Sequence, residues 1–171
     1  NPKEPMAKLL ARWHEDPDVS AAFWEERDSP YRQLVERAFS EYVKWSATPP
    51  VPTHAGMAGI IPGDSSAIVN IDGFRLGLIG LNSAFLQLSD GNYEGHLDVS
   101  ESQLLSVTNQ APDDWTKNNH ANLLITYHPP TWIERLAHQR YRSEIYPPRR
   151  FTAHLFGHMH FPTTEVTSEI G

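Results

Sequence analysis

Residues 65–83, SSAIVNIDGFRLGLIGLNS, decide the fold, because two β-rich runs flank an Asp-Gly pair within them. Asp72 and Gly73 are a strong hairpin signal, since both central residues of the commonest two-residue hairpin turn need a positive φ angle. The second run, from Phe74 to Leu81, is apolar at consecutive positions, as in a strand that is covered on both faces. The stretch therefore predicts a β-hairpin whose second strand lies inside a sheet.

Helical and strand patterns alternate after the hairpin. The first helical pattern, residues 98–111, contains Ser100 and Gln103 in the spacing of a helix capping box. We expect a helix at 98–111, a buried strand at 121–126, a short helix at 131–142, a last buried strand at 149–162 and the start of another at 163–170. This order predicts an α/β domain with helices packed on a sheet.

The first third of the chain has a helical pattern. Residues 4–16 space apolar side chains at helical intervals, and residues 29–46 place Tyr31 to Trp45 on one stripe. Residues 46–59 then break the pattern with three prolines and two glycines, which indicates a linker or loop. We therefore expect a helical segment over residues 1–50.

The composition excludes several kinds of site. With a formal charge of −7, the chain as a whole has no basic surface to hold nucleic acid by releasing counterions. It contains no cysteine, so a metal must be held by His, Asp, Glu or Asn. No apolar run approaches the roughly 20 residues of a membrane-spanning helix, and we expect a cytoplasmic protein. No Gly-x-Ser-x-Gly motif supports a serine hydrolase.

Three of the nine histidines are candidate metal ligands because of their places on predicted strands. His128 follows the buried strand 121–126, at the carboxyl end where open α/β sheets place their chemistry. His158 and His160 are two residues apart, so both imidazoles can face one side of the last strand and bind a metal. Two unrelated histidines on a solvent face would have the same spacing. We expect His14, His54, His120 and His138 on the surface and His154 in the core or at a sheet edge, and His96 is ambiguous.

Two short motifs resemble the last sequence blocks of the calcineurin-like metallophosphoesterases. In LITYHPP, residues 124–130, a strand ends at a histidine, and LFGHMH, residues 155–160, is a Gly-His-x-His motif. The apolar strand and turn in residues 72–85 and the Gln-Leu helix after it are also similar to the middle of that family. The resemblance covers residues 57–170. It implies an α/β fold, part of a metallophosphoesterase-like β-sandwich flanked by helices, with an N-terminal helical insertion.

The resemblance further implies a centre of two divalent metal ions. In the family pattern His128 and His158 ligate one ion, His160 ligates the other, and Gly157 is the turn residue of the motif. Two such ions clamp a phosphate, and a bridging water attacks phosphorus in line with the leaving oxygen. Histidine, asparagine and carboxylate ligands suit Mn, Fe or Zn, and the sequence does not choose among these metals.

The family's earlier blocks, an Asp-x-His, a Gly-Asp after a buried strand and a Gly-Asn-His, are not found in this sequence. They supply the bridging aspartate and the histidine that protonates the leaving group, so no catalytic residue is identified in this chain. The chain starts at Asn1 rather than at methionine, and we expect the missing blocks upstream. Residues 1–50 would then be a helical insertion and residues 51–171 the C-terminal part of the catalytic domain. We expect Asp64 to be a turn residue and Asn82 a strand-end cap.

Two functions stay open at this point. The first is a metal-dependent phosphoesterase that hydrolyses a phosphomonoester or phosphodiester and needs the upstream part of the same polypeptide to complete its site. The alternative is a non-catalytic or degenerate α/β interaction or regulatory module with at most a single metal site. Nucleic acid is a substrate that the family allows but this sequence does not indicate, and we interpret the basic residues of 138–151 as a solvated helix face.

Overall fold

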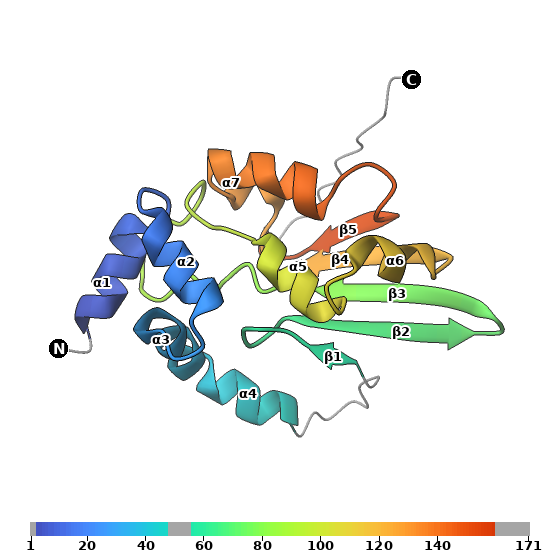
Figure 1. Cartoon of the computed structure of the whole chain (residues 1–171), viewed down its shortest axis with the longest axis horizontal. Coiled ribbons are helices and arrows are strands. Elements are labelled where there is room, and N and C mark those ends of the chain that lie inside the picture. The colour runs from blue at the N-terminus through green and yellow to red at the C-terminus, as the bar shows by residue number, and fades with distance from the viewer. Residues whose placement is uncertain (1–2, 48–55, 160–171) are drawn as a thin grey trace.

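The computed structural model, which describes residues 3–47 and 56–159, has N-terminal helices followed by one open mixed sheet with interspersed helices (Figure 1). The predicted α/β class is therefore confirmed. Neighbouring strands pair antiparallel from β1 to β3 and parallel from β3 to β5, in the order β1-β2-β3-β4-β5. The strands are β1 (Met57–Ala58), β2 (Ser65–Ile71), β3 (Phe74–Gly80), β4 (Ala121–Thr126) and β5 (Ala153–Phe156). The strand expected at 163–170 lies outside the described residues.

The hairpin forms where the sequence predicts it. Ile71 of β2 pairs with Phe74 of β3, which leaves Asp72 and Gly73 as the two turn residues. Their φ angles are 50° and 85°, so both lie in the left-handed region that this tight hairpin turn requires.

Both parallel connections of the sheet run through helices. α5 (Glu101–Val107) and α6 (Pro112–Lys117) connect β3 to β4, and α5 begins with the predicted capping box. The connection from β4 to β5 contains η1 (Pro130–Trp132), α7 (Arg135–Arg140) and the π-helical segment η2 (Tyr141–Ile145). The single short helix expected at 131–142 is thus divided into three helical segments.

The helices of these connections bury one face of the sheet. Ile79 of β3 and Leu124 of β4 are fully buried in a cluster that also contains Leu104 of α5. The opposite face is less covered, because Ile125 and its register partner Leu155 are 39% and 49% exposed. The sheet therefore presents apolar side chains on a face that the described helices leave partly open.

Four helices make up the N-terminal segment: α1 (Lys3–Arg12), α2 (Pro17–Glu25), α3 (Pro30–Ala38) and α4 (Ser40–Ala47). The helix expected over residues 29–46 is broken at Phe39 into α3 and α4. Its predicted apolar stripe ends early, since Tyr42 and Trp45 are 42% and 60% exposed. α2 was not predicted, although Asp16 accepts a hydrogen bond from the first turn and Pro17 starts the helix.

The N-terminal helices share a hydrophobic cluster with the segment that follows β3. Trp13 and Phe23 pack edge to face at 5.2 Å between ring centroids, and Phe85 lies 5.2 Å from Trp13. The indole nitrogen of Trp13 also donates a 2.8 Å hydrogen bond to the buried carboxylate of Asp98. In Figure 1, α1 to α3 gather at the end of the sheet where β3, β4 and β5 end. None of the helices in the described residues has the length and hydrophobicity to cross a membrane.

Candidate metal site

His128 and His158 follow two neighbouring parallel strands at the same offset. β4 ends at Thr126 and β5 at Phe156, and these two residues are register partners. Each histidine lies two residues beyond its strand, and the carboxyl ends of parallel strands meet at one edge of the sheet. The centroids of the two imidazole rings are 4.8 Å apart. The structure thus brings together the two predicted ligands that it describes.

Ser83, just beyond the end of β3, fixes the position of His128. Its hydroxyl oxygen accepts a 2.9 Å hydrogen bond from the backbone N–H of His128 and lies 3.1 Å from Nδ1 of the same residue. Both side chains are buried, with about 1% of each residue exposed. With Nδ1 held against Ser83, the other ring nitrogen, Nε2, is the one that can bind a ligand.

Nε2 of His128 is buried and has no hydrogen-bond partner among the described residues. Burial, together with the neighbouring His158, lowers the pKa of His128 to about 4 and outweighs the raising effect of the hydrogen bond with Ser83. The ring is therefore neutral near pH 7, which is the form that binds metal ions. A buried neutral nitrogen without a partner, next to a second imidazole, fits a divalent ion of the Mn, Fe or Zn type.

Aromatic side chains enclose the two histidines. Trp132 of η1 stacks on His128 with ring centroids 5.1 Å apart and meets the ring of His158 edge to face at 4.2 Å. Tyr127 contacts both imidazoles edge to face, at 4.7 Å from His128 and 5.1 Å from His158. These ring contacts restrict the orientation of both imidazoles.

The backbone turns sharply at His158. Its φ angle is 65°, and the N–H of Met159 donates a 2.8 Å hydrogen bond to the carbonyl of Gly157. A three-residue turn of this kind with a positive central φ is rare and strained. Gly157 is its first residue, as the motif implies, but the left-handed conformation lies at His158. A Cβ atom at Gly157 would meet only the backbone oxygen and ring of Tyr127, at 3.8 Å and 4.0 Å.

A second layer of hydrogen bonds holds the turn that carries Ser83. Asp64 accepts hydrogen bonds from the backbone N–H of Asn82 and from Nε2 of Gln103, both at 2.8 Å. Asn82 in turn accepts a 2.8 Å hydrogen bond from the N–H of Ala84, as expected of a strand-end cap. Gln103 therefore connects the capping box of α5 to the loop beneath the candidate site.

Asp64 is more than the turn residue that its sequence position predicts. It does lie directly before β2, but its side chain is buried and one carboxyl oxygen has no partner among the described residues. Burial outweighs the lowering effect of the hydrogen bonds from Asn82 and Gln103 and raises its pKa from 3.8 to about 7. The sequence signal for this role was absent, because the contacts depend on residues 18 and 39 positions away.

The third predicted ligand, His160, lies outside the described residues, as does His54. Within residues 3–47 and 56–159, no group of three or more His, Asp or Glu side chains is placed to hold a metal ion. His14, His96 and His120 are exposed, whereas His138 is half-buried. His154, predicted to lie in the core or at an edge, makes hydrogen bonds with Thr126 and Tyr141.

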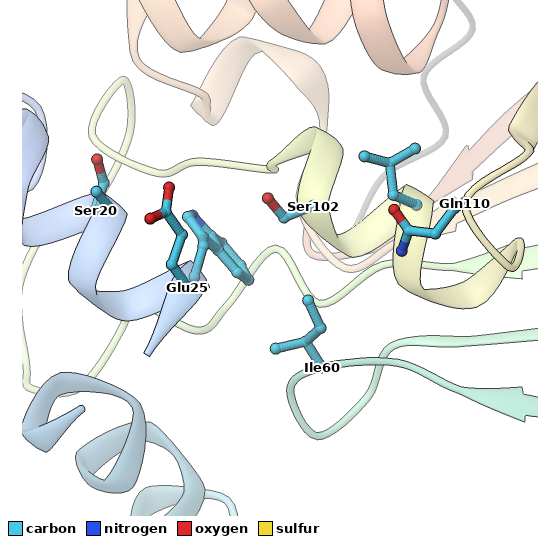
Figure 2. A pocket seen from close by; sticks show the side chains of 8 residues that line it. Ser20, Glu25, Ile60, Ser102 and Gln110 are labelled. Atoms are coloured by element: carbon cyan, nitrogen blue, oxygen red, sulfur yellow. The ribbon is translucent and has the colours of Figure 1, made fainter. Parts of the chain in front are cut away.

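Two cavities in the described residues lie apart from the histidine pair. One, of about 310 Å³, opens between α2 and α5, with Ser20 and Glu25 on one side and Ser102 and Gln110 on the other (Figure 2). Trp24 also lines this cavity. The other, of about 510 Å³, lies at the amino end of β4. Neither is lined by His128 or His158.

Comparisons with known proteins add no relatives to this description. No family model, curated protein or solved structure matches the chain.

Proposed function

We propose that the chain is the C-terminal part of a metal-dependent phosphoesterase of the calcineurin-like type, in which His128 and His158 hold one divalent ion. One observation carries the proposal: two imidazoles from adjacent parallel strands lie in contact, and the buried Nε2 of His128 has no partner among the described residues. A buried polar atom without a hydrogen bond costs about 1–3 kcal/mol, and a metal ion bound at Nε2 of His128 would remove this cost.

The residues of the chain have distinct roles in this proposal. His128 and His158 bind the first ion, and His160 binds the second, as the resemblance implies. In the tautomer protonated at Nδ1, which this proposal requires, His128 donates from Nδ1 to the hydroxyl oxygen of Ser83 3.1 Å away, and Nε2 is left to bind the metal. Trp132 holds the two imidazoles at a fixed angle. A bound pair of divalent ions supplies charge neutralisation at phosphate and a water of lowered pKa for attack on phosphorus.

We also propose how the fold is completed and where the other residues of the metal centre lie. A second sheet packed on the open face of β3, β4 and β5, where Ile125 and Leu155 are exposed, would complete a β-sandwich. We infer that the bridging aspartate and the proton donor come from polypeptide upstream of Asn1. In this scheme residues 1–50 form a helical insertion and residues 51–171 the C-terminal part of the catalytic domain. The substrate is a phosphate ester, and the compartment is the cytoplasm.

The alternative is a non-catalytic α/β module with at most one metal site. The observation in its favour is that the described residues bring only His128 and His158 together and form no group of three ligands. Two imidazoles hold a divalent ion more weakly than the four ligands of a typical structural site. Such a module would bind one ion or none and would have no hydrolytic activity when extended upstream.

Hydrolysis of an aryl phosphodiester with added Mn tests the proposal against this alternative. The protein is a version of the chain extended upstream, compared with its His158→Ala and His160→Ala variants. We expect turnover in the extended protein and its near-complete loss in both variants, with the fold unchanged by circular dichroism. His138→Ala serves as the matched control, because His138 lies on α7 away from the pair. Full turnover in both histidine variants would contradict the proposal.

A further inference from the structure

We propose that His154 is a positioning residue: as the tautomer protonated at Nε2, it acts through the Thr126 hydroxyl to hold the backbone carbonyl of His128. This inference adds a residue to the proposed metal site. Only its consequence for metal binding rests on the proposed function. The hydrogen-bond chain on which it depends lies entirely within the described residues.

The Thr126 hydroxyl determines the direction of the chain. Its oxygen lies 2.7 Å from the backbone carbonyl oxygen of His128 and 2.8 Å from Nε2 of His154. A carbonyl only accepts hydrogen bonds, so the single hydroxyl proton of Thr126 points to His128. The same oxygen must then accept from His154, and this requires a proton on Nε2.

The other nitrogen of His154 completes the chain. Nδ1 lies 2.9 Å from the hydroxyl oxygen of Tyr141, which belongs to η2. In a neutral ring with its proton on Nε2, Nδ1 is an acceptor, so the Tyr141 hydroxyl donates to it. Donors and acceptors therefore run in one direction from Tyr141 through His154 and Thr126 to the carbonyl of His128. Hydrogen bonds in such a series strengthen one another.

The surroundings of His154 keep it neutral. Its ring lies among the rings of Tyr141, Tyr146 and Phe156, with centroid distances of 5.9, 5.9 and 5.3 Å. Burial lowers its pKa to about 4. A proton on Nδ1 would remove the acceptor that faces Tyr141, so the neutral ring is the form that fits this chain.

The chain matters because it holds the backbone on the carbonyl side of the His128 Cα atom while Ser83 holds it on the amide side. Ser83 accepts from the backbone N–H, and Thr126 donates to the carbonyl. The imidazole projects between these two bonds. Loss of the Thr126 hydrogen bond frees the carbonyl and lets the ring of His128 move. Mutation of a residue that hydrogen-bonds to a metal ligand typically lowers metal affinity by about 10- to 100-fold.

Two substitutions at one position separate this role from ordinary packing. His154→Gln places an amide nitrogen near Nε2 and keeps the donation to Thr126. His154→Asn places its amide near Nδ1, so it keeps a partner for Tyr141 and loses the donation. If His154 only filled space, the two variants would behave alike.

The first measurement is the imidazole ¹⁵N spectrum of the wild-type chain without metal. We expect His154 to show a protonated Nε2 and a bare Nδ1. In His154→Asn, the ring signals of His128 should move away from their wild-type positions, and in His154→Gln they should stay close to them. The opposite tautomer, or equal shifts in the two variants, would overturn the proposal.

The second measurement is Zn²⁺ affinity of the same proteins by titration calorimetry. We expect His154→Asn to bind about tenfold more weakly than wild type and His154→Gln to stay within about twofold. Equal affinities of the two variants would overturn the consequence for metal binding. If wild type binds no Zn²⁺, the proposed metal site fails, and the ¹⁵N spectra still decide whether His154 positions His128.

A second pair of variants covers the case in which His154→Asn does not fold. Thr126→Val removes the hydroxyl with little change in shape, whereas Thr126→Ser keeps it. We expect Thr126→Val to shift the His128 ring signals and Thr126→Ser to leave them near wild type. Wild-type signals in Thr126→Val would overturn the proposal.

Discussion

The hydroxyl oxygen of Ser83 lies 3.1 Å from Nδ1 and 2.9 Å from the backbone nitrogen of His128, so one side chain contacts both the ring and the backbone of this candidate ligand. The two residues come from the ends of adjacent parallel strands, β3 and β4. The sheet itself therefore sets the distance between them.

Replacement of Ser83 by alanine should weaken both stability and metal binding. The backbone N–H of His128 would stay buried without its acceptor, which costs about 1–3 kcal/mol in the free energy of unfolding. The ring would also lose the partner that fixes its tautomer, and we expect Zn²⁺ affinity to fall about 10- to 100-fold. Urea unfolding and calorimetric titration measure the two effects.

Ser89→Ala is the matched control for Ser83→Ala. The Ser89 hydroxyl is exposed and bonds only to the hydroxyl of Tyr93, at 2.8 Å. We expect its loss to change the unfolding free energy by less than about 0.5 kcal/mol and to leave Zn²⁺ affinity unchanged. Equal behaviour of the two serine variants would show that Ser83 does not position His128.

The buried carboxyl of Asp64 should make stability depend on pH in an unusual direction. Its pKa is raised from 3.8 to about 7 in the folded chain, so between these values the folded state binds more protons than the unfolded state. The contribution to the free energy of unfolding is present below pH 4 and is lost as pH rises through 7. The loss is on the order of 4 kcal/mol.

Asp64→Asn isolates this effect, because an amide keeps the acceptor for Asn82 and Gln103 but does not titrate. We expect wild type to lose stability relative to Asp64→Asn as pH rises from 4.5 to 8. Urea unfolding at several pH values gives the difference. A difference that is independent of pH would mean that Asp64 is ionised throughout this range.

His154 should give the opposite pH dependence. Burial lowers its pKa from 6.5 to about 4, so between these values the unfolded state binds more protons than the folded state. Stability from this group is complete above pH 6.5 and is lost as pH falls through 4, by about 3 kcal/mol. His154→Gln lacks this group, and its unfolding free energy should fall less than that of wild type on acidification from pH 7 to pH 4.5. Parallel curves would rule out a neutral buried His154.

Removal of the hydrogen bond from Trp13 to Asp98 tests whether the N-terminal helices are an integral part of the fold. Trp13→Phe keeps an aromatic ring against Phe23 and Phe85 but leaves the buried carboxylate of Asp98 without its 2.8 Å partner. We expect a loss of about 1–3 kcal/mol in unfolding free energy. Trp45→Phe, at a position that is 60% exposed, should change little. Equal effects of the two substitutions would contradict the shared cluster.

Local signals predicted much of the fold. The Asp72-Gly73 turn, the capping box at Ser100 and the strand Ala121–Thr126 each depend on residues close together in the sequence. The break at Phe39 was missed because the apolar stripe continues through it in the sequence, although Tyr42 and Trp45 are exposed in the structure. α2 was missed although Asp16 and Pro17 are a helix-start signal.

The candidate site was predictable only in part. Strand-end positions identified His128 and His158, because the ends of parallel strands meet. Ser83 also follows a predicted strand, and this position at the strand end was the sequence signal that could have placed it beside His128. The buried contacts of Asp64 and the chain through His154 join distant parts of the sequence, and spacing along the chain does not reveal them.

Metal content distinguishes a metal site at His128 and His158 from a pair of structural histidines. The chain extended upstream, purified without chelators and dialysed against Mn²⁺ or Zn²⁺, is compared with its His128→Ala and His158→Ala variants by elemental analysis. We expect about two ions per wild-type chain and the loss of at least one in each variant. No bound metal in wild type, or an unchanged content in both variants, would contradict it and leave His128 and His158 as structural histidines.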